Sequence, residues 1–158
     1  MKKLLLMAVM AIASLTANAQ TIGVNLDYAT NCTPSSLGIG VKYQHPLSGA
    51  WRLEGSGNFY FKKDYTTWWD LNVNAHYLFD LGSNINFYPL AGVGVDTSSV
   101  SVGGSSASQT WFITNIGAGI ELPITSSVKL NFELKDQIHF GDGGGSRIVF
   151  QLGVGFAI

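Results

Sequence analysis

The sequence predicts an all-β protein: an eight-stranded antiparallel up-and-down transmembrane β-barrel with a lipid-facing apolar exterior and a small or polar lumen. Three observations lead to this prediction. Apolar and polar residues alternate along almost the whole chain after residue 19, with the two-residue period of a strand. Turn-like segments divide the alternation into eight stretches. There are 19 glycines and only 12% charged residues, about half the charge usual in soluble domains.

The first 19 residues have the layout of a secretory signal peptide. Lys2 and Lys3 precede an apolar run over residues 4–15, and Ala-Asn-Ala at residues 17–19 is a small-x-small cleavage site. We expect cleavage there, which leaves residues 20–158 as one barrel domain. An uncleaved anchor is the disfavoured alternative, because the run is short for a membrane span.

The mature chain offers no other route across a membrane than a barrel. No later stretch approaches the roughly 20 unbroken apolar residues of a spanning helix. Without Lys2 and Lys3 the net charge is about −3, and nothing in the sequence indicates nucleic-acid binding. Cys32 is the only cysteine and cannot form an internal disulfide. We expect a free thiol in a loop, with an intermolecular disulfide as the alternative.

We expect each of the first four strands where every second residue is apolar or glycine, because these residues form one face of a strand. These faces run over Ile22–Tyr28, Leu37–Tyr43, Trp51–Phe61 and Trp69–Phe79. Pro34 places a loop at 30–36, and the polar residues at 62–66 indicate a second loop. The segments 45–49 and 80–84 have the composition of short turns.

The last four strands follow the same rule. Their apolar faces run over Ile85–Val95, Phe112–Leu122, Val128–Phe140 and Ile148–Ile158. Pro89 lacks a ladder donor and should mark a bulge or local irregularity. The Ser- and Gly-rich segment 97–108 is expected to be the longest flexible loop, 123–127 a turn and 141–146 the last loop. Asp136 interrupts an apolar face, so we expect it near the upper membrane interface.

The connections predict an orientation in the membrane. Turns after the even strands are short, whereas several loops after odd strands are longer. With a signal peptide delivering the N-terminus to the periplasm, the turns lie in the periplasm and the loops outside, in the outer membrane of a Gram-negative bacterium. Aromatic residues of the apolar face group near both strand ends and predict two interfacial girdles. Near the turns these are Tyr43, Trp51, Tyr77 and Phe156, and near the loops Tyr28, Phe61, Trp69 and Phe140.

The polar face should line the lumen. In a soluble barrel of lipocalin type the large apolar residues would point inward, but eight strands enclose too little volume for them. Placed inside, the polar face supplies small residues and charges of both signs, which need partners in a low-dielectric interior. The expected lumen network is structural and consists of Lys42, Arg52, Glu54, Asp70, His76, Glu121, Lys129, Glu133 and Lys135. Antiparallel strands joined by a short turn place residues at similar distances from the turn side by side, so we expect Lys42 near Glu54 and Glu121 near Lys129.

The strand number, the turn and loop asymmetry and the alternating last strand, with its apolar end Phe156-Ala157-Ile158, resemble a known family. It is the small eight-stranded outer-membrane β-barrel proteins of OmpA/OmpX-like type, the outer-membrane protein β-barrel domain family. The resemblance covers residues 20–158. It implies outer-membrane lipid, lipopolysaccharide and the barrel-assembly machinery as partners, and a possible surface ligand at the loops 30–36, 62–66, 97–108 and 141–146. No periplasmic peptidoglycan-binding domain is implied.

The favoured function is that of a non-enzymatic integral outer-membrane protein with a structural, envelope-integrity or surface-adhesion role. A small channel for ions or small hydrophobic solutes is the alternative. A lipid A-modifying enzyme is least favoured, because His139 has inward parity and no serine follows in a His-x-Ser pair. Asp142 has no partner carboxylates for a calcium loop. We therefore predict no catalytic residue, cofactor or metal.

Overall fold

The computed structural model describes residues 20–30 and 35–158. The predicted signal peptide, Cys32 and most of the predicted loop at 30–36 lie outside the described residues and remain predictions. Within the described ranges, no helix is long and apolar enough to cross a membrane.

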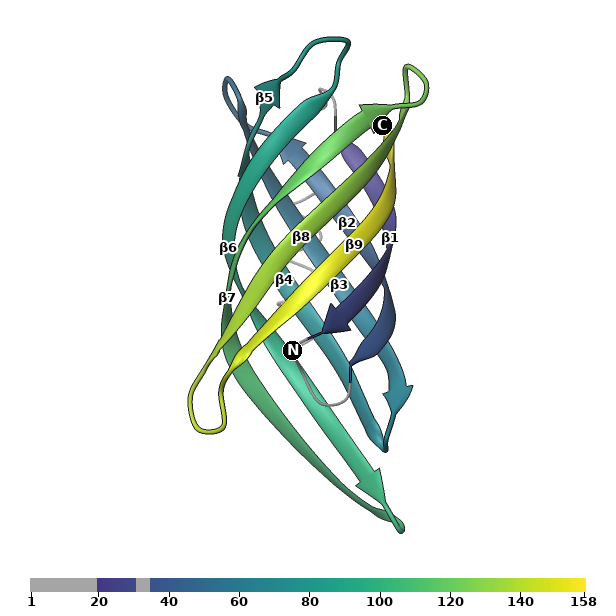
Figure 1. Cartoon of the computed structure of the whole chain (residues 1–158), viewed down its shortest axis with the longest axis vertical. Coiled ribbons are helices and arrows are strands. Elements are labelled where there is room, and N and C mark those ends of the chain that lie inside the picture. Colours follow the sequence, from purple (N-terminus) through teal and green to yellow (C-terminus); the bar gives the residue numbers. More distant parts are fainter. Residues whose placement is uncertain (1–19, 31–34) are drawn as a thin grey trace, which may run out of the picture.

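Strand segments make up most of the described chain (Figure 1). In chain order they are β1 (Thr21–Thr30), β2 (Ser36–Pro46), β3 (Trp51–Lys63), β4 (Thr66–Tyr77), β5 (Phe79–Asp80), β6 (Asn86–Val102), β7 (Ser105–Pro123), β8 (Val128–Phe140) and β9 (Ser146–Ala157). The largest differences from the predicted bounds occur in β6 and β7, which are both longer than expected.

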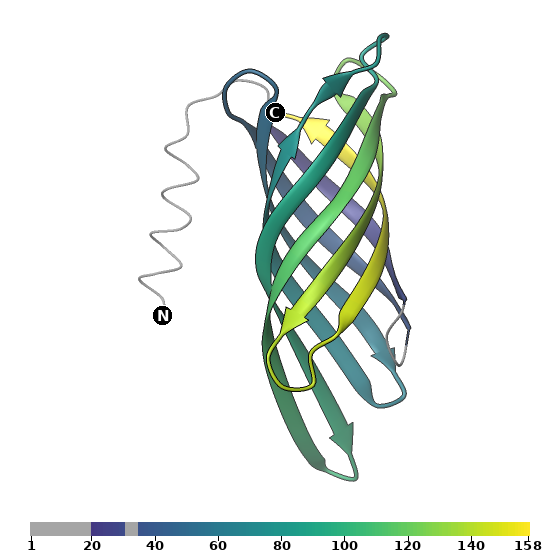
Figure 2. The ribbon, with the colours of Figure 1, turned by 60° about the vertical axis from the view of Figure 1, so that its left-hand side comes forward.

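The strands form one closed antiparallel barrel (Figures 1 and 2). Strands that follow one another in the chain pair side by side, β1 pairs with β9, and both β4 and β5 pair with β6. β5 continues the line of β4 after Leu78, so the nine described segments make eight barrel strands. The predicted fold, an eight-stranded antiparallel up-and-down barrel, is confirmed.

The strands are staggered around the barrel. From Ser36 on β2, paired residues can be followed once around through Ala29, Val149, Lys135, Gly117, Leu90, His76 and Arg52. The circuit closes at Pro46, ten residues farther along β2. A closed eight-stranded sheet with such a stagger has strands tilted by roughly 35–45° and an interior just wide enough for packed side chains.

The two faces of each strand point as the alternation predicts. On β1 the side chains of Ile22, Val24, Leu26 and Tyr28 are 44–60% exposed, whereas Asn25 and Asp27 are 4% and 1% exposed. The same alternation recurs in the other strands. The apolar residues therefore form the outer surface and the polar residues fill the lumen, which confirms the predicted sidedness.

The barrel has two ends, which are joined differently. The turn end carries the connections 47–50, 81–85 and 124–127, and the hairpin end carries 64–65, 103–104 and 141–145. The connection predicted at 62–66 is present but shorter than expected, because a two-residue turn at Asp64 and Tyr65 joins β3 to β4. Both residues have positive φ, 49° and 66°, as a type I′ hairpin turn requires. Loop length therefore does not distinguish the two ends.

The predicted flexible loop at 97–108 is wrong, since this segment is a regular β-hairpin. β6 and β7 have 17 and 19 residues and extend beyond the other strands at the hairpin end (Figure 1). Gly103 and Gly104 make the turn with φ of 59° and 85°, a conformation that glycine adopts without strain. The hydroxyls of Ser99 and Ser108 pair across the hairpin at 2.9 Å.

Pro89 marks an irregularity, as predicted, but the irregularity lies in the neighbouring strand. Pro89 pairs with Ala118 of β7 with no shift of register. On its other side, the pairing of β6 with β4 stops before Pro89 and resumes with β5 beyond it. Proline has no amide hydrogen to donate to the ladder, and the break at Leu78 directly follows Tyr77, the residue that the register places opposite Pro89. The Leu78 amide donates to the Ala50 carbonyl instead, at 2.8 Å.

Candidate functional site: the barrel lumen

Large side chains fill the lumen. Tyr60, Tyr88 and His76 have no exposed surface, and Lys135 and Arg147 are each 1% exposed. Room for them comes from glycines on the inward face. A Cβ at Gly40 would overlap the Asn58 amide, and one at Gly119 would overlap the Tyr88 ring. The interior is therefore a packed polar core.

Charged side chains occupy the half of the lumen near the turn end. We name this group the turn-end cluster: Lys42, Arg52, Glu54, His76, Glu121, Lys129, Glu133 and Lys135. The Lys42 ammonium lies 3.9 Å from Glu54, and Lys129 lies 3.7 Å from Glu121. Arg52 also donates to Glu121 from across the lumen. Each carboxylate thus has a cation beside it, the condition under which buried charges are tolerated.

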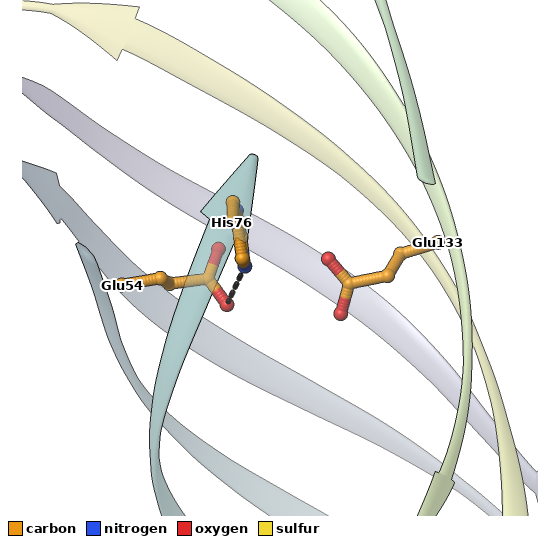
Figure 3. A group of neighbouring side chains, drawn as sticks. All are labelled: Glu54, His76 and Glu133. Atoms are coloured by element: carbon orange, nitrogen blue, oxygen red, sulfur yellow. Dashed lines mark ion pairs between the residues drawn. The ribbon is translucent and has the colours of Figure 1, made fainter. Parts of the chain in front are cut away.

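Three members of the turn-end cluster are close enough together to be considered as metal ligands. Glu54, His76 and Glu133 each offer an atom within 4.8 Å of the others (Figure 3). However, Arg52 donates to His76 Nδ1 from Nε at 3.2 Å, and arginine can only donate. In neutral His76 the proton is therefore on Nε2, the nitrogen that faces Glu54 at 3.8 Å.

This tautomer does not suit a metal ligand, because the nitrogen that faces Glu54 and Glu133 carries the proton. A histidine that binds a metal through Nε2 usually donates its Nδ1–H to an acceptor, and here that position faces a guanidinium. Lys135 also lies 3.4 Å from the Glu133 carboxylate. The contacts therefore favour an ion-pair network over a metal site.

Amide side chains form a belt across the middle of the lumen. The amide belt consists of Asn25, Asn58, Asn72, Asn74, Asn115, Gln137 and Gln151, all less than 5% exposed. On one side Gln151 accepts from Lys42 at 2.9 Å. On the other, Asn58 and Asn72 each donate to Asp70 at 2.6 Å. The belt joins the charged groups of the two halves through hydrogen bonds.

A second charged group lies near the hairpin end. This hairpin-end cluster consists of Asp70, Asp96, His139 and Arg147. The Arg147 guanidinium is 3.1 Å from Asp70 and 3.4 Å from Asp96, and it stacks on the rings of Tyr60 and Trp68 at 4.7 and 5.1 Å. His139 Nε2 is 2.7 Å from Asp96. His139 is thus turned into the lumen and away from lipid, in agreement with its parity in the sequence.

Several lumen residues were missed by the sequence analysis. Asp27, Asp96, Arg147 and the amide belt belong to the network but were not among its expected members. Each lies on the inward face of its strand, so the alternation of inward and outward side chains along the strand is enough to identify them. Asp27, for example, accepts from Gln151 at 2.7 Å and from Asn25 at 2.8 Å. Amide side chains supply much of this interior, beside the charged groups.

The predicted girdle residues all lie on the outer surface. Tyr28, Trp51, Phe61, Trp69, Tyr77, Phe140 and Phe156 are exposed, and Tyr43 is half-buried. At the turn end, the rings of Trp51 and Tyr77 are 5.1 Å apart and those of Tyr77 and Phe79 are 4.9 Å apart. Asp136 also faces outward, half-buried between its strand partners Ile116 and Ile148.

Comparison with known proteins adds a family. The sequence profile described as outer membrane protein beta-barrel domain matches residues 4–157. No curated protein matches the sequence.

Several solved structures share the architecture. Neisserial surface protein A is 17% identical with a TM-score of 0.71, covering 88% of this chain and 96% of that one. The N-terminal β-barrel domain of Pseudomonas aeruginosa OprF is 21% identical with a TM-score of 0.70, covering 87% and 97%. The attachment invasion locus protein Ail of Yersinia pestis is 18% identical with a TM-score of 0.63, covering 89% and 97%.

Two further solved structures have the same fold. Ail has also been solved in complex with the heparin analogue sucrose octasulfate. The outer membrane enzyme PagL is 13% identical with a TM-score of 0.60, covering 87% of this chain and 99% of that one. At these identities the likeness concerns the fold alone.

Proposed function

Because the chain belongs to the outer membrane protein beta-barrel domain family, we propose that it is a non-enzymatic integral protein of the bacterial outer membrane. Its role in this proposal is to contribute to envelope integrity and to present a surface for adhesion. We further propose that residues 1–19 are a cleaved signal peptide and that the hairpin end faces outward. The observation that carries the proposal is the filled lumen.

The filled lumen favours a structural role over a channel. Water-filled pores occur in barrels of many more strands, whereas eight strands leave room for packed side chains only. Here two charged clusters are joined by an amide belt, and side-chain amides do not take up protons at neutral pH. An ion or proton crossing the lumen would have to break pairs such as Arg147 with Asp70 at 3.1 Å, at a cost of several kcal/mol.

Single-channel recording tests this proposal against the channel alternative. The refolded protein is inserted into a planar bilayer, and insertion is verified by the different gel mobility of unheated and boiled samples. We expect no discrete conductance steps. Regular steps from a sample that shows the folded band would establish the channel instead.

The non-enzymatic part rests on the absence of an assembled catalytic group among the described residues that face lipid. The Asp96 and His139 pair lies inside the barrel, away from acyl chains. We expect lipopolysaccharide incubated with the refolded protein to keep its lipid A mass in mass spectrometry. Loss or transfer of an acyl chain would make the protein an enzyme, as PagL is.

The adhesion part draws on the hairpin end and on the relatives. Ail is by its name an attachment and invasion protein, and it has been solved with a sulfated sugar. At the hairpin end of this chain, the exposed cations among the described residues are few and include Lys62 and Lys63 near the β3–β4 turn. We propose outer-membrane lipid and lipopolysaccharide as its surroundings and the barrel-assembly machinery as the partner in insertion. The extended β6–β7 hairpin is the candidate for surface contacts.

A further inference from the structure

Each connection at the turn end begins with an exposed aliphatic residue. These residues are Leu47, Leu81 and Ile124, and the last residue of the chain, Ile158, adds a fourth at the same end (Figure 1). All four side chains are 56–61% exposed. Turns are usually built from Gly, Pro, Asn, Asp and Ser, so turn formation does not account for an aliphatic residue at this position. We call the four residues the aliphatic rim.

The same backbone hydrogen bond places the three rim residues of the turns. The Leu47 amide donates to the carbonyl of Trp51, four residues farther on, at 2.9 Å, and Leu81 and Ile124 make the equivalent bond at 2.8 Å. Residues directly opposite one another in an antiparallel pair have their side chains on the same face. Trp51 lies on the outer face of the wall. The rim therefore continues the lipid-facing surface beyond the regular strands.

Alternation along the strands gives the same direction. Ile158 lies two positions beyond Phe156, which is exposed on the outer face, and its amide donates to the Gln20 carbonyl at 2.9 Å. Leu81 likewise lies two positions beyond Phe79, another exposed outer residue. Because side chains alternate with a period of two along a strand, both rim residues have the outward direction.

The rim surrounds the barrel. Its members lie at the β2–β3, β5–β6 and β7–β8 connections and at the end of β9, so one occurs at every second barrel strand. Strands about 4.8 Å apart and tilted by roughly 40° place neighbouring rim residues about 12 Å apart around the wall. A docking protein needs a contiguous apolar patch, whereas a lipid leaflet meets the barrel from every side. This spacing therefore fits lipid better than a protein partner.

The described connections at the hairpin end have a different composition. They are Asp64 with Tyr65, Gly103 with Gly104, and the glycine-rich residues 141–145, and none of these residues is aliphatic. Polar and glycine tips suit an end that projects into water. Aliphatic tips suit an end that stops within the membrane interface, where apolar side chains reach the boundary between headgroups and acyl chains.

We propose that the aliphatic rim inserts into the inner, periplasmic leaflet of the outer membrane and fixes the depth of the turn end. Its partner is the phospholipid of that leaflet, at the level where acyl chains meet headgroups. Withdrawing the rim side chains from water favours this depth. The inference rests on the proposed function, since it requires a bilayer around the wall and the hairpin end outside.

Spin labels test where the rim lies. In a Cys32→Ser background, which has no other cysteine, the three rim residues of the turns are replaced one at a time by cysteine and labelled with a nitroxide. The protein is refolded into phosphatidylcholine vesicles. We expect the ratio of oxygen accessibility to that of a water-soluble nickel complex to be at least about threefold higher than at Ser48 and Ser126. These two control sites are exposed residues of the same turns.

A triple variant tests whether the rim sets the depth. Leu47→Ser, Leu81→Ser and Ile124→Ser together remove the aliphatic surface, so the turn end should move toward water. Trp51 beside Leu47 reports this movement when the other tryptophans are replaced by phenylalanine. Its quenching by lipids brominated midway along the acyl chains should fall at least about twofold.

A matched control removes exposed aliphatic side chains from the opposite end. Val100→Ser with Val102→Ser changes the extended hairpin and should leave the quenching of Trp51 unchanged. Each variant is first shown to give the heat-modifiable folded band, and the single-label measurement does not depend on the folding of the triple variant.

Two outcomes would overturn the proposal. Equal accessibility at the rim and control sites, with the nickel complex reaching both, would place the rim in water and leave it open to a periplasmic protein. Unchanged quenching of Trp51 in the folded triple variant would show that the rim does not set the depth. Either result leaves a folded, non-conducting barrel in the gel and conductance assays, so the proposed function is judged separately.

Discussion

At the scale of single residues, glycine positions distinguish the inside of the wall from the outside. A Cβ at Gly117 would overlap the Leu134 carbonyl oxygen and the Lys135 backbone, whereas one at Gly55 on the lipid face meets nothing within 4 Å. We expect Gly117→Ala to lower the free energy of unfolding by about 1–3 kcal/mol, as overpacking does. Gly55→Ala should leave it within about 0.5 kcal/mol. Urea unfolding in lipid vesicles measures both, and equal effects would contradict the assigned faces.

The buried ion pairs give a second prediction at this scale. Lys135 and Glu133 lie 3.4 Å apart with fully buried side chains. Lys135→Met leaves a carboxylate without its nearest cation and should destabilise the barrel by about 3–5 kcal/mol. Adding Glu133→Gln removes that charge, and Tyr88 can still donate to the remaining oxygen, so the double variant should recover most of the loss. A double variant as unstable as the single one would show that the pair is not the source of the effect.

At the scale of elements, the extended hairpin should be dispensable for folding. Beyond Thr97 and Thr110 its side chains are exposed or nearly so, apart from Ser98. We expect that replacing residues 99–108 with an Asn-Gly turn, which leaves the paired residues Ser98 and Gln109 beside the turn, keeps the heat-modifiable band and changes the unfolding free energy by no more than about 1–2 kcal/mol. Loss of the folded band would show that the hairpin is part of the stable barrel.

The elements also show how far a sequence can predict this structure. Alternation located all eight strands, because each must present one face to lipid and one to the lumen. The segment 97–108 was predicted as a loop because Gly is depleted in strands and clusters of Ser and Gly are typical of loops. Gly103-Gly104 nevertheless makes a tight turn, and the hydroxyls of Thr97 and Thr110 pair at 2.9 Å. The extension depends on contacts with the β3–β4 hairpin, which composition does not reveal.

The lumen was predictable in character but not in detail. Parity assigns Asp70 and Arg147 to the interior, yet they are 77 positions apart. Their contact depends on the register of every strand between them and on the ten-residue stagger of the closed barrel. The tautomer of His76 likewise depends on the hydrogen bond from Arg52. Alternation along the strand predicts that Arg52 faces the lumen, but not which atom its side chain contacts. The sequence therefore predicts contacts only between neighbouring strands joined by one turn, such as the contact between Lys42 and Glu54.

At the scale of the whole molecule, the four tryptophans report on which side of the wall faces lipid. Trp51 and Trp69 are 51% and 39% exposed on the outer face. Trp68 packs on Arg147 at 5.1 Å, and Trp111 bonds to Asp142 at 3.2 Å. In single-tryptophan variants with phenylalanine elsewhere, brominated acyl chains should quench Trp51 and Trp69 at least about twofold more than the other two. Equal quenching of all four would contradict the sidedness.

The polar network also constrains the order of assembly. Gln151 near the end of the chain donates to Asp27 near its beginning, and Arg147 on β9 lies 3.1 Å from Asp70 on β4. While the β1–β9 seam is open, these groups lack their partners, and acyl chains cannot solvate them. Insertion into the bilayer and pairing of the first and last strands should therefore occur together, because an open sheet would expose charged groups without partners to the hydrocarbon region of the membrane.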